Sequence, residues 1–234
     1  VNRPISAIER CLRAKNEMDA DLIAKTPYKA HKYRMIVGGG DEITIICRGS
    51  DALDIVKAYF DELSNTPELS PGIPNTSCAG IALFHSHAPF ADVYKIAENC
   101  CESGKKESHR PENNGNYIDF HYCHSGITNE LDVIREDQEV IFTLRPYSLD
   151  EFEEFISVGR IMRSVGRSNV KSLGDAVVKG TSYFRFEIQR IRSRNYDGFN
   201  ELIDNHADDE EKLKRVIYDI SVVYDLWFGG EEDA

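Results

Sequence analysis

Residues 36–46 read Ile-Val-Gly-Gly-Gly-Asp-Glu-Ile-Thr-Ile-Ile, and this stretch decides how the rest of the chain is interpreted. Apolar, β-branched residues stand on both sides of three glycines and an acidic pair. Lys32–Val37 and Glu42–Cys47 have the composition of strands, and a glycine turn between two strands is typical of a β-hairpin. We therefore expect an antiparallel hairpin with Asp41 and Glu42 at its tip.

The hairpin lies within an alternation of predicted helices and strands. A helix over 4–24 precedes it, and a helix that begins at Ser50 or Asp51 and reaches Leu63 follows it. The next predicted elements are a strand over 77–84, a helix from 89 to about 103, a polar loop over 105–116 and a strand over 117–123. This order predicts an α+β fold, with a mostly antiparallel sheet and helices on one face. It would match a ferredoxin-like or palm-type unit if one more strand preceded Val1.

The second part of the chain has a different pattern. A strand-like run over 139–144 is followed by a helix over 149–163. Further helices are predicted around 168–180, 182–194 and 207–228. We place the boundary between a palm-like domain and a C-terminal, mostly helical domain at 128/129.

The charge is strongly acidic but uneven. The 28 basic and 40 acidic residues give a formal net charge of −12, so a surface that binds nucleic acid over its whole area is excluded, while a local basic groove or a nucleotide site is not. Between Arg160 and Arg194 there are nine basic residues, opposed only by Asp175 and Glu187. Such a run is usually a solvated helix face. The alternative is a surface that docks a partner or faces RNA.

Compartment and metal content are constrained by the apolar runs and the cysteines. The apolar runs, such as residues 80–84, are far shorter than the roughly 20 residues that span a bilayer, so we expect no membrane partner and a cytoplasmic protein. The six cysteines form no Cys-x-x-Cys pair, which favours buried free thiols over a zinc site. Because the first residue is Val1 and not methionine, we expect the chain to begin inside a longer polypeptide.

The predicted hairpin tip carries groups suited to nucleotide chemistry. Glycines at 38–40 remove side chains and permit positive φ, so a nucleotide can approach the backbone closely. Carboxylates at 41 and 42 can hold Mg²⁺, which prefers oxygen ligands. In nucleotidyl transfer such ions activate the attacking hydroxyl and neutralise the triphosphate. A plain Gly-Asp turn without chemical function remains the alternative.

The hairpin segment resembles the Gly-Gly-Asp-Asp or Gly-Gly-Asp-Glu turn of nucleotide cyclase palm domains. It is most similar to the large polymerase-like subunit of type III CRISPR effector complexes and to the related minimal CRISPR polymerases. Four further segments are similar to that family, in the same order along the chain. They are residues 78–90 (Cys-Ala-Gly-Ile-Ala-Leu-Phe-His to Ala-Pro-Phe), residues 97–106 (a helix ending in a lysine-bearing turn), residues 117–121 (Tyr-Ile-Asp-Phe-His) and residues 143–149 (Thr-Leu-Arg-Pro-Tyr-Ser-Leu). The resemblance covers about residues 30–160.

The resemblance implies an activity and a set of roles. The activity is an Mg²⁺-dependent (or Mn²⁺-dependent) nucleotidyltransferase that makes cyclic oligonucleotides from ATP or another NTP in antiviral defence. The acidic pair Asp41 and Glu42 would be catalytic and would ligate the metal. The nucleotide would be bound by Gly38, Gly39, Gly40, Lys105 and Lys106, where the lysines follow a helix similar to one in the family. Glu42 stands where the CRISPR family usually has a second aspartate.

Two features depart from the family and keep other functions open. A palm of this kind carries another metal-binding aspartate on a first strand, and no such strand precedes Ile5. Only one palm is present, while cyclisation brings two nucleotides together, so a second palm is implied, from a homodimer or an upstream half. One alternative is an inactive palm that serves as a structural or regulatory subunit, contacting a CRISPR ribonucleoprotein through Arg160–Arg194. Another is a GGDEF-type diguanylate cyclase.

Overall fold

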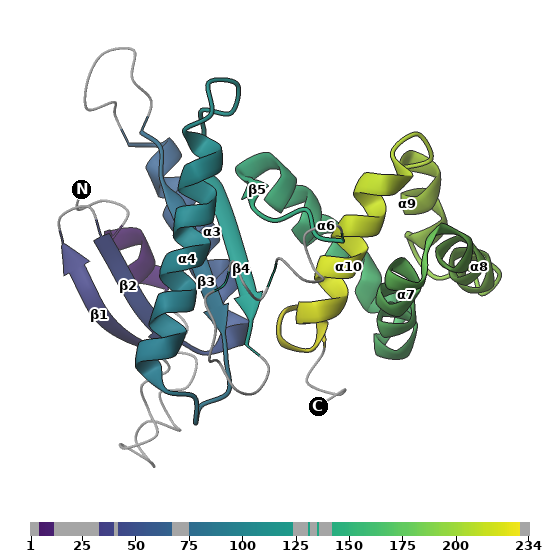
Figure 1. The fold of residues 1–234 in the computed structure, drawn as a ribbon, viewed down its shortest axis with the longest axis horizontal. Coiled ribbons are helices and arrows are strands. Elements are labelled where there is room, and N and C mark those ends of the chain that lie inside the picture. The colour runs from purple at the N-terminus through teal and green to yellow at the C-terminus, as the bar shows by residue number, and fades with distance from the viewer. Residues whose placement is uncertain are drawn as a thin grey trace. The chain divides into compact units, whose positions relative to one another are not determined.

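The computed structural model describes residues 5–11, 33–39, 42–66, 75–123, 131, 135 and 142–229. These form an α+β fold with two compact units, Val1–Thr76 and Ser77–Ala234 (Figure 1). The coarse fold class predicted from the sequence is therefore confirmed. The predicted boundary at 128/129 falls among residues that are not described and stays a prediction.

The first unit is built on the predicted hairpin. Strands β1 (Tyr33–Gly39) and β2 (Glu42–Cys47) pair antiparallel, and the described part of the unit also contains a helix over 5–11 and helix α3 (Ala52–Ser64). A short 3-10 turn, η1 (Gly49–Asp51), leads into α3. The described part of the predicted 4–24 helix is its first two turns; the remainder lies outside the described residues.

The core of this unit follows from the alternation of apolar residues. Ile8 and Ile55 are buried at its centre. The partly buried residues that pack against them come from both strands and both helices: Cys11, Tyr33, Ile43, Ile45, Cys47 and Tyr59. A β-bulge between Met35 and Val37 makes Ile36 the extra residue of β1, and Ile36 is 41% exposed. Alternate strand positions therefore anchor the hairpin on the helices.

The second unit begins with a β-α-β motif. Strand β3 (Cys78–Leu83) pairs in parallel with β4 (Tyr117–Tyr122), and helix α4 (Phe90–Ser108) connects them. A two-residue strand, β5 (Tyr147–Ser148), pairs antiparallel with β4. The sheet predicted as mostly antiparallel thus has one parallel and one antiparallel pair of strands in this unit. A crossover helix between the strands allows the parallel pairing.

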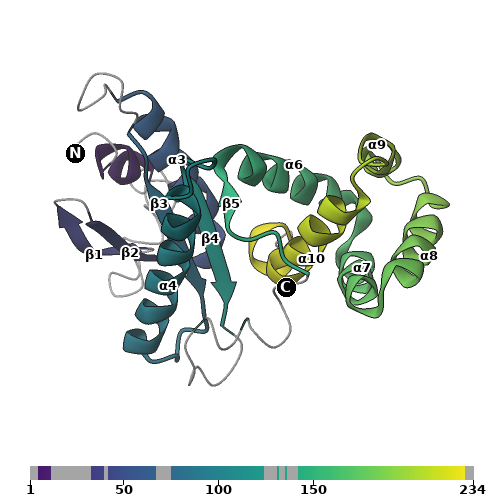
Figure 2. The same ribbon diagram turned by 45° about the horizontal axis from the view of Figure 1, so that its top comes forward.

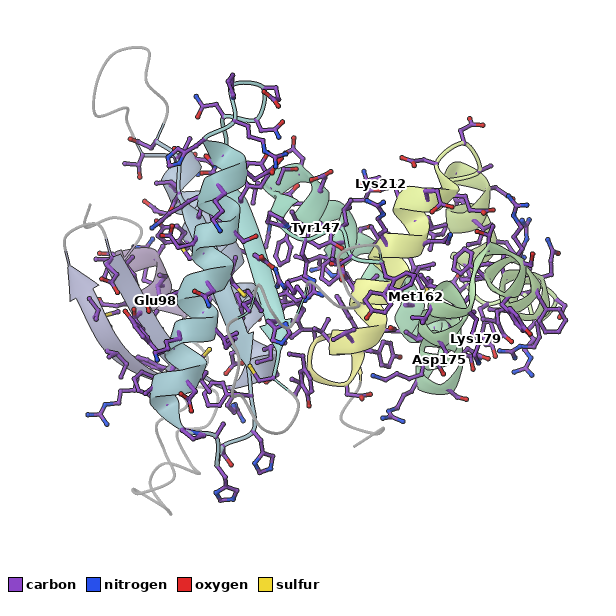
Figure 3. The ribbon with its side chains drawn as sticks, in the orientation of Figure 1. Glu98, Tyr147, Met162, Asp175, Lys179 and Lys212 are labelled. Carbon is purple, nitrogen blue, oxygen red and sulfur yellow. The ribbon has the colours of Figure 1, made fainter. Side chains whose placement is uncertain are left out.

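Helices α6 to α10 follow β5 in the second unit. Their bounds are α6 (Leu149–Val165), α7 (Arg167–Lys179), α8 (Thr181–Arg192), α9 (Phe199–Asn205) and α10 (Glu210–Trp227). They form a bundle in which α10 packs on α6 and α7, as both ribbon views show (Figure 2). Met162 lies in its core with no exposed surface (Figure 3).

The sheet of the second unit is covered on both faces, not on one as predicted. Helix α4 packs along β3 and β4. On the other face, Phe120 of β4 contacts the bundle, with ring centroids 4.9 Å from Trp227 and 5.4 Å from Phe155. Burial on both faces explains why β4 is buried at five consecutive residues.

Two sequence predictions around this sheet are wrong. Helix α4 continues to Ser108, so the loop expected over 105–116 begins later. Lysines suit the last turn of a helix because its carbonyl end is partly negative. Within the strand expected over 139–144, the described residues Phe142–Leu144 belong to no strand, and the strand that does form is β5.

Candidate functional site

The hairpin tip in the first unit is the candidate site. The register pairs Gly39 with Glu42 and Gly38 with Ile43, so two residues, Gly40 and Asp41, separate the last paired positions in the sequence. Both of these residues lie outside the described residues. The register thus brings together three of the predicted site residues, Gly38, Gly39 and Glu42.

The backbone at the tip is open on the side of Gly39. A Cβ added at Gly39 would have no atom within 4 Å, whereas one added at Gly38 would overlap the sulfur of Met35. Both glycines are exposed. A ligand can therefore reach the Gly39 backbone without displacing a side chain.

Glu42 presents its carboxylate at the start of β2. The side chain is exposed, and Oε1 accepts a hydrogen bond of 3.3 Å from the Thr44 hydroxyl two residues along the strand. Residues two apart in a strand share a face, so Thr44 can orient this carboxylate without neutralising it. An exposed carboxylate beside an open backbone is the donor set that a hydrated Mg²⁺ ion accepts.

The two predicted phosphate-binding lysines belong to the second unit. Lys105 and Lys106 lie in the last turn of α4. The Lys105 ammonium forms an ion pair of 2.7 Å with Glu102, and this hydrogen bond raises the pKa of Lys105. Both side chains of the pair are about half exposed. Phosphate binding by Lys105 would therefore compete with an internal carboxylate.

No cluster of three or more His, Cys, Asp or Glu side chains that suits a metal occurs within the described part of the chain. Asp119, in the family-like segment 117–121, is buried and binds both terminal nitrogens of Arg135, at 2.7 and 2.9 Å. It is thus a structural ion pair and not an available metal ligand. The exposed His85 and His87 rings lie 5.2 Å apart, as a pair without a third donor among these residues.

The basic run Arg160–Arg194 is partly neutralised by carboxylates, most of which lie outside the run in sequence. Five of its nine basic residues form ion pairs. The pairs are Arg167 and Lys171 with Asp225, Arg185 with Glu210, Arg190 with Glu187, and Arg192 with Asp204. A continuous phosphate-binding track is disfavoured, since each pair would have to open.

A buried polar network was missed by sequence reasoning. Thr143, Arg145 and Tyr147, all in the family-like segment 143–149, bind one carboxylate, Asp219 of α10. The partner lies more than 70 residues along the chain, so local pattern offered no signal for it. This segment fastens the sheet to the bundle.

No protein-family model and no curated protein matches this sequence. Among the described helices, none is both long enough and apolar enough to span a membrane.

Proposed function

We propose that this chain is a palm-type, Mg²⁺-dependent nucleotidyltransferase that joins ATP or another NTP into cyclic oligonucleotides. The observation that carries the proposal is the register of the β1–β2 hairpin, which sets Glu42 opposite Gly39. Asp41 directly precedes Glu42 in the sequence. The order hairpin, α3, β3, α4, β4 is also the order expected of such a palm.

The proposed chemistry divides the work among the tip residues. Asp41 and Glu42 hold the metal ion, which supplies positive charge beside the triphosphate. The open backbone at Gly39 and Gly40 admits the nucleotide. The 3′-hydroxyl of one nucleotide attacks the α-phosphate of another, and pyrophosphate leaves. Because a single hairpin serves one nucleotide, the second is held by another palm, from a second copy or from an upstream part of a longer polypeptide.

The direct experiment incubates the full chain with labelled ATP and Mg²⁺ or Mn²⁺ and separates linear from cyclic products. Asp41→Ala and Glu42→Ala are expected to lower product formation by at least about a hundredfold, as loss of charge stabilisation does at other sites. Asp61→Ala is the matched control, since Asp61 is an exposed carboxylate of α3 that forms an ion pair with Lys57 in the same helix.

The result that would overturn the activity is product formation that is unchanged in Asp41→Ala and Glu42→Ala. Replacing ATP by GTP distinguishes the alternative of a diguanylate cyclase, which would make its product from GTP alone. Glu42→Asp restores the acidic pair usual in the CRISPR family. It is expected to retain activity, because both side chains offer carboxylate oxygens.

A second candidate function, an inactive palm that docks in an RNA-guided complex, is favoured by one observation. Tyr183 and Phe186 of α8 are 60% and 64% exposed, and aromatic residues are enriched where proteins dock. Binding to RNA or to a complex that weakens with salt, survives Asp41→Ala and is lost in Tyr183→Ala plus Phe186→Ala would support this function. Retained binding in the aromatic double variant would exclude it for this surface.

A further inference from the structure

Three chemically reactive side chains meet where β3 packs on α4. The Cys101 thiol donates a hydrogen bond of 3.4 Å to the carbonyl oxygen of Cys78. Lys105 lies one helical turn beyond Cys101. The hydrogen bond to Glu102 raises the pKa of Lys105 most, and the charge of the nearby Cys101 raises it further. Two cysteines, Cys78 and Cys101, and the Lys105 ammonium group therefore lie in the region where β3 packs on α4.

Close backbone packing sets Cys78 against the turn of α4 that begins at Cys101. A Cβ added at Gly80 would overlap the carbonyl oxygen of Ala97, so β3 and α4 approach without a side chain between them. Cys78 shares this face of β3, because alternate strand residues point the same way. A Cβ added at Gly104 would lie 3.4 Å from Cys78 Cβ and 3.6 Å from its sulfur. Cys78 thus rests on the turn of α4 that runs from Cys101 to Gly104.

These two cysteines differ from their neighbours in access. Cys78 and Cys101 are partly exposed, whereas Cys100 and Cys123 are buried. Burial raises the pKa of Cys78, and the charge of Lys105 opposes that change. Burial also raises the pKa of Cys123 to about 11. A small oxidant can therefore reach Cys78 and Cys101 more easily than the buried Cys100 and Cys123. Burial also disfavours the thiolate, which is the reactive form of a cysteine.

We propose that Cys78 and Cys101 form a reversible disulfide when the protein meets a peroxide. One thiolate attacks hydrogen peroxide, takes one oxygen as a sulfenic acid and releases hydroxide, which leaves as water. The second thiolate attacks the sulfenic sulfur and displaces its hydroxide, which also leaves as water. Two thiols and one peroxide thus give one disulfide and two waters. A thiol reductant reverses the change.

The disulfide ties the start of β3 to α4 and closes a loop that spans 23 residue positions. Such a link restricts the unfolded chain, so it stabilises the second unit against heat. It also fixes the helix whose last turn carries Lys105 and Lys106. The modification stands whether or not the hairpin binds nucleotide.

The test uses the full chain, fully reduced, then exposed to excess hydrogen peroxide and alkylated under denaturing conditions. Intact mass is expected to show that the six alkylatable thiols become four. Fragment spectra of the digest are expected to join the Cys78 peptide to Cys101 and not to the adjacent Cys100. Dithiothreitol is expected to restore all six.

Two variants sharpen the assignment. Cys101→Ser is expected to lose the disulfide and to leave Cys78 as a sulfenic acid that dimedone traps. Cys123→Ser, the matched control at a buried thiol, is expected to keep it. Lys105→Gln is expected to slow the reaction severalfold, because a nearby cation favours the thiolate.

The proposal fails if wild-type protein keeps six thiols, or if the linked peptides contain Cys11 or Cys47 instead. It also fails if sulfenic or sulfinic acid accumulates in the wild type without a disulfide. Since peptide mapping of the wild type decides between these outcomes, a variant that does not fold leaves the test intact.

Discussion

The Tyr147 hydroxyl donates a hydrogen bond of 2.7 Å to the carboxylate of Asp219, and neither residue has exposed surface. Thr143 donates to the same carboxylate at 2.7 Å, the Leu144 backbone at 3.0 Å, and Arg145 forms an ion pair with it at 3.1 Å. Burial raises the pKa of Asp219, while Arg145 and the hydrogen bonds lower it. Asp219 of α10 therefore binds the segment that leads into β5. Tyr147 of this segment is labelled in Figure 3.

Replacing Asp219 is expected to destabilise the protein more than removing one of the hydrogen bonds that its carboxylate accepts. Asp219→Asn leaves the buried Arg145 without its counter-charge and is expected to cost about 3–5 kcal/mol of unfolding free energy. Tyr147→Phe removes a single hydrogen bond and is expected to cost about 1–2 kcal/mol. Urea unfolding measures both. The control Asp175→Asn, at an exposed carboxylate of α7, is expected to change stability by less than about 0.5 kcal/mol.

The close approach of β3 and α4 predicts that a side chain at position 80 destabilises the protein. Gly80→Ala places a methyl group against the Ala97 carbonyl, which is backbone and cannot rotate away, so α4 must shift from the sheet. The expected cost is about 1–3 kcal/mol, measured by thermal or urea unfolding. At Gly115 an added Cβ would meet only the Asn113 carbonyl, at 3.9 Å, so Gly115→Ala is the matched control. Equal stability of the two variants would contradict the close packing.

The start of α6 supplies a third prediction. The Ser148 hydroxyl accepts from the Glu151 backbone at 3.4 Å, and the Glu151 carboxylate accepts from the Ser148 backbone at 3.0 Å. This capping box satisfies two backbone donors, so Ser148→Ala is expected to cost about 1 kcal/mol. Ser157→Ala, at an exposed position inside the same helix, is expected to be neutral or slightly stabilising. Urea unfolding of both variants separates the cap from helix propensity.

Local pattern was sufficient for most of the elements. Alternating apolar residues located β4, β-branched residues located β2, and the 3.6-residue period located α3, α6, α7, α8 and α10 close to their bounds. The end of α4 was not predictable from the same pattern. Gly104 and two lysines resemble a helix end, yet Gly104 is required there because Cys78 and Tyr117 pack on it.

Long-range relationships were beyond local pattern. Nothing beside Arg145 or Tyr147 in the sequence identifies Asp219 as their partner, and the basic run contains no sign of the carboxylates of α9 and α10 that neutralise it. The parallel pairing of β3 and β4 likewise depends on how α4 crosses between them. In the candidate site, the register confirmed an antiparallel hairpin in which Glu42 pairs with Gly39, while the tip at Asp41 and Glu42 and the chemistry assigned to these two residues stay predictions.

Glu154 of α6 is expected to give the folded protein a stability that depends on pH in the acid range. Its carboxylate accepts a hydrogen bond of 2.6 Å from the Lys212 ammonium and lies 3.0 Å from His206 Nε2. Lys212 is labelled in Figure 3. Burial opposes ionisation, but the hydrogen bonds with Lys212 and His206 outweigh it and lower the pKa of Glu154. A lowered carboxyl pKa stabilises the folded state above the ordinary value of 4.5, and this stabilisation is lost as pH falls through the folded-state pKa.

Glu154→Gln is therefore expected to cost about 0.5–1 kcal/mol at pH 7, a small value because both partners are partly solvated. The difference from wild type should shrink below pH 4.5 and vanish once Glu154 is protonated in the folded protein. Urea unfolding across this range measures it, with Glu153→Gln as the control at the exposed neighbouring carboxylate. A difference that stays constant down to pH 3 would show that the Glu154 side chain acts through packing, because packing does not depend on its charge.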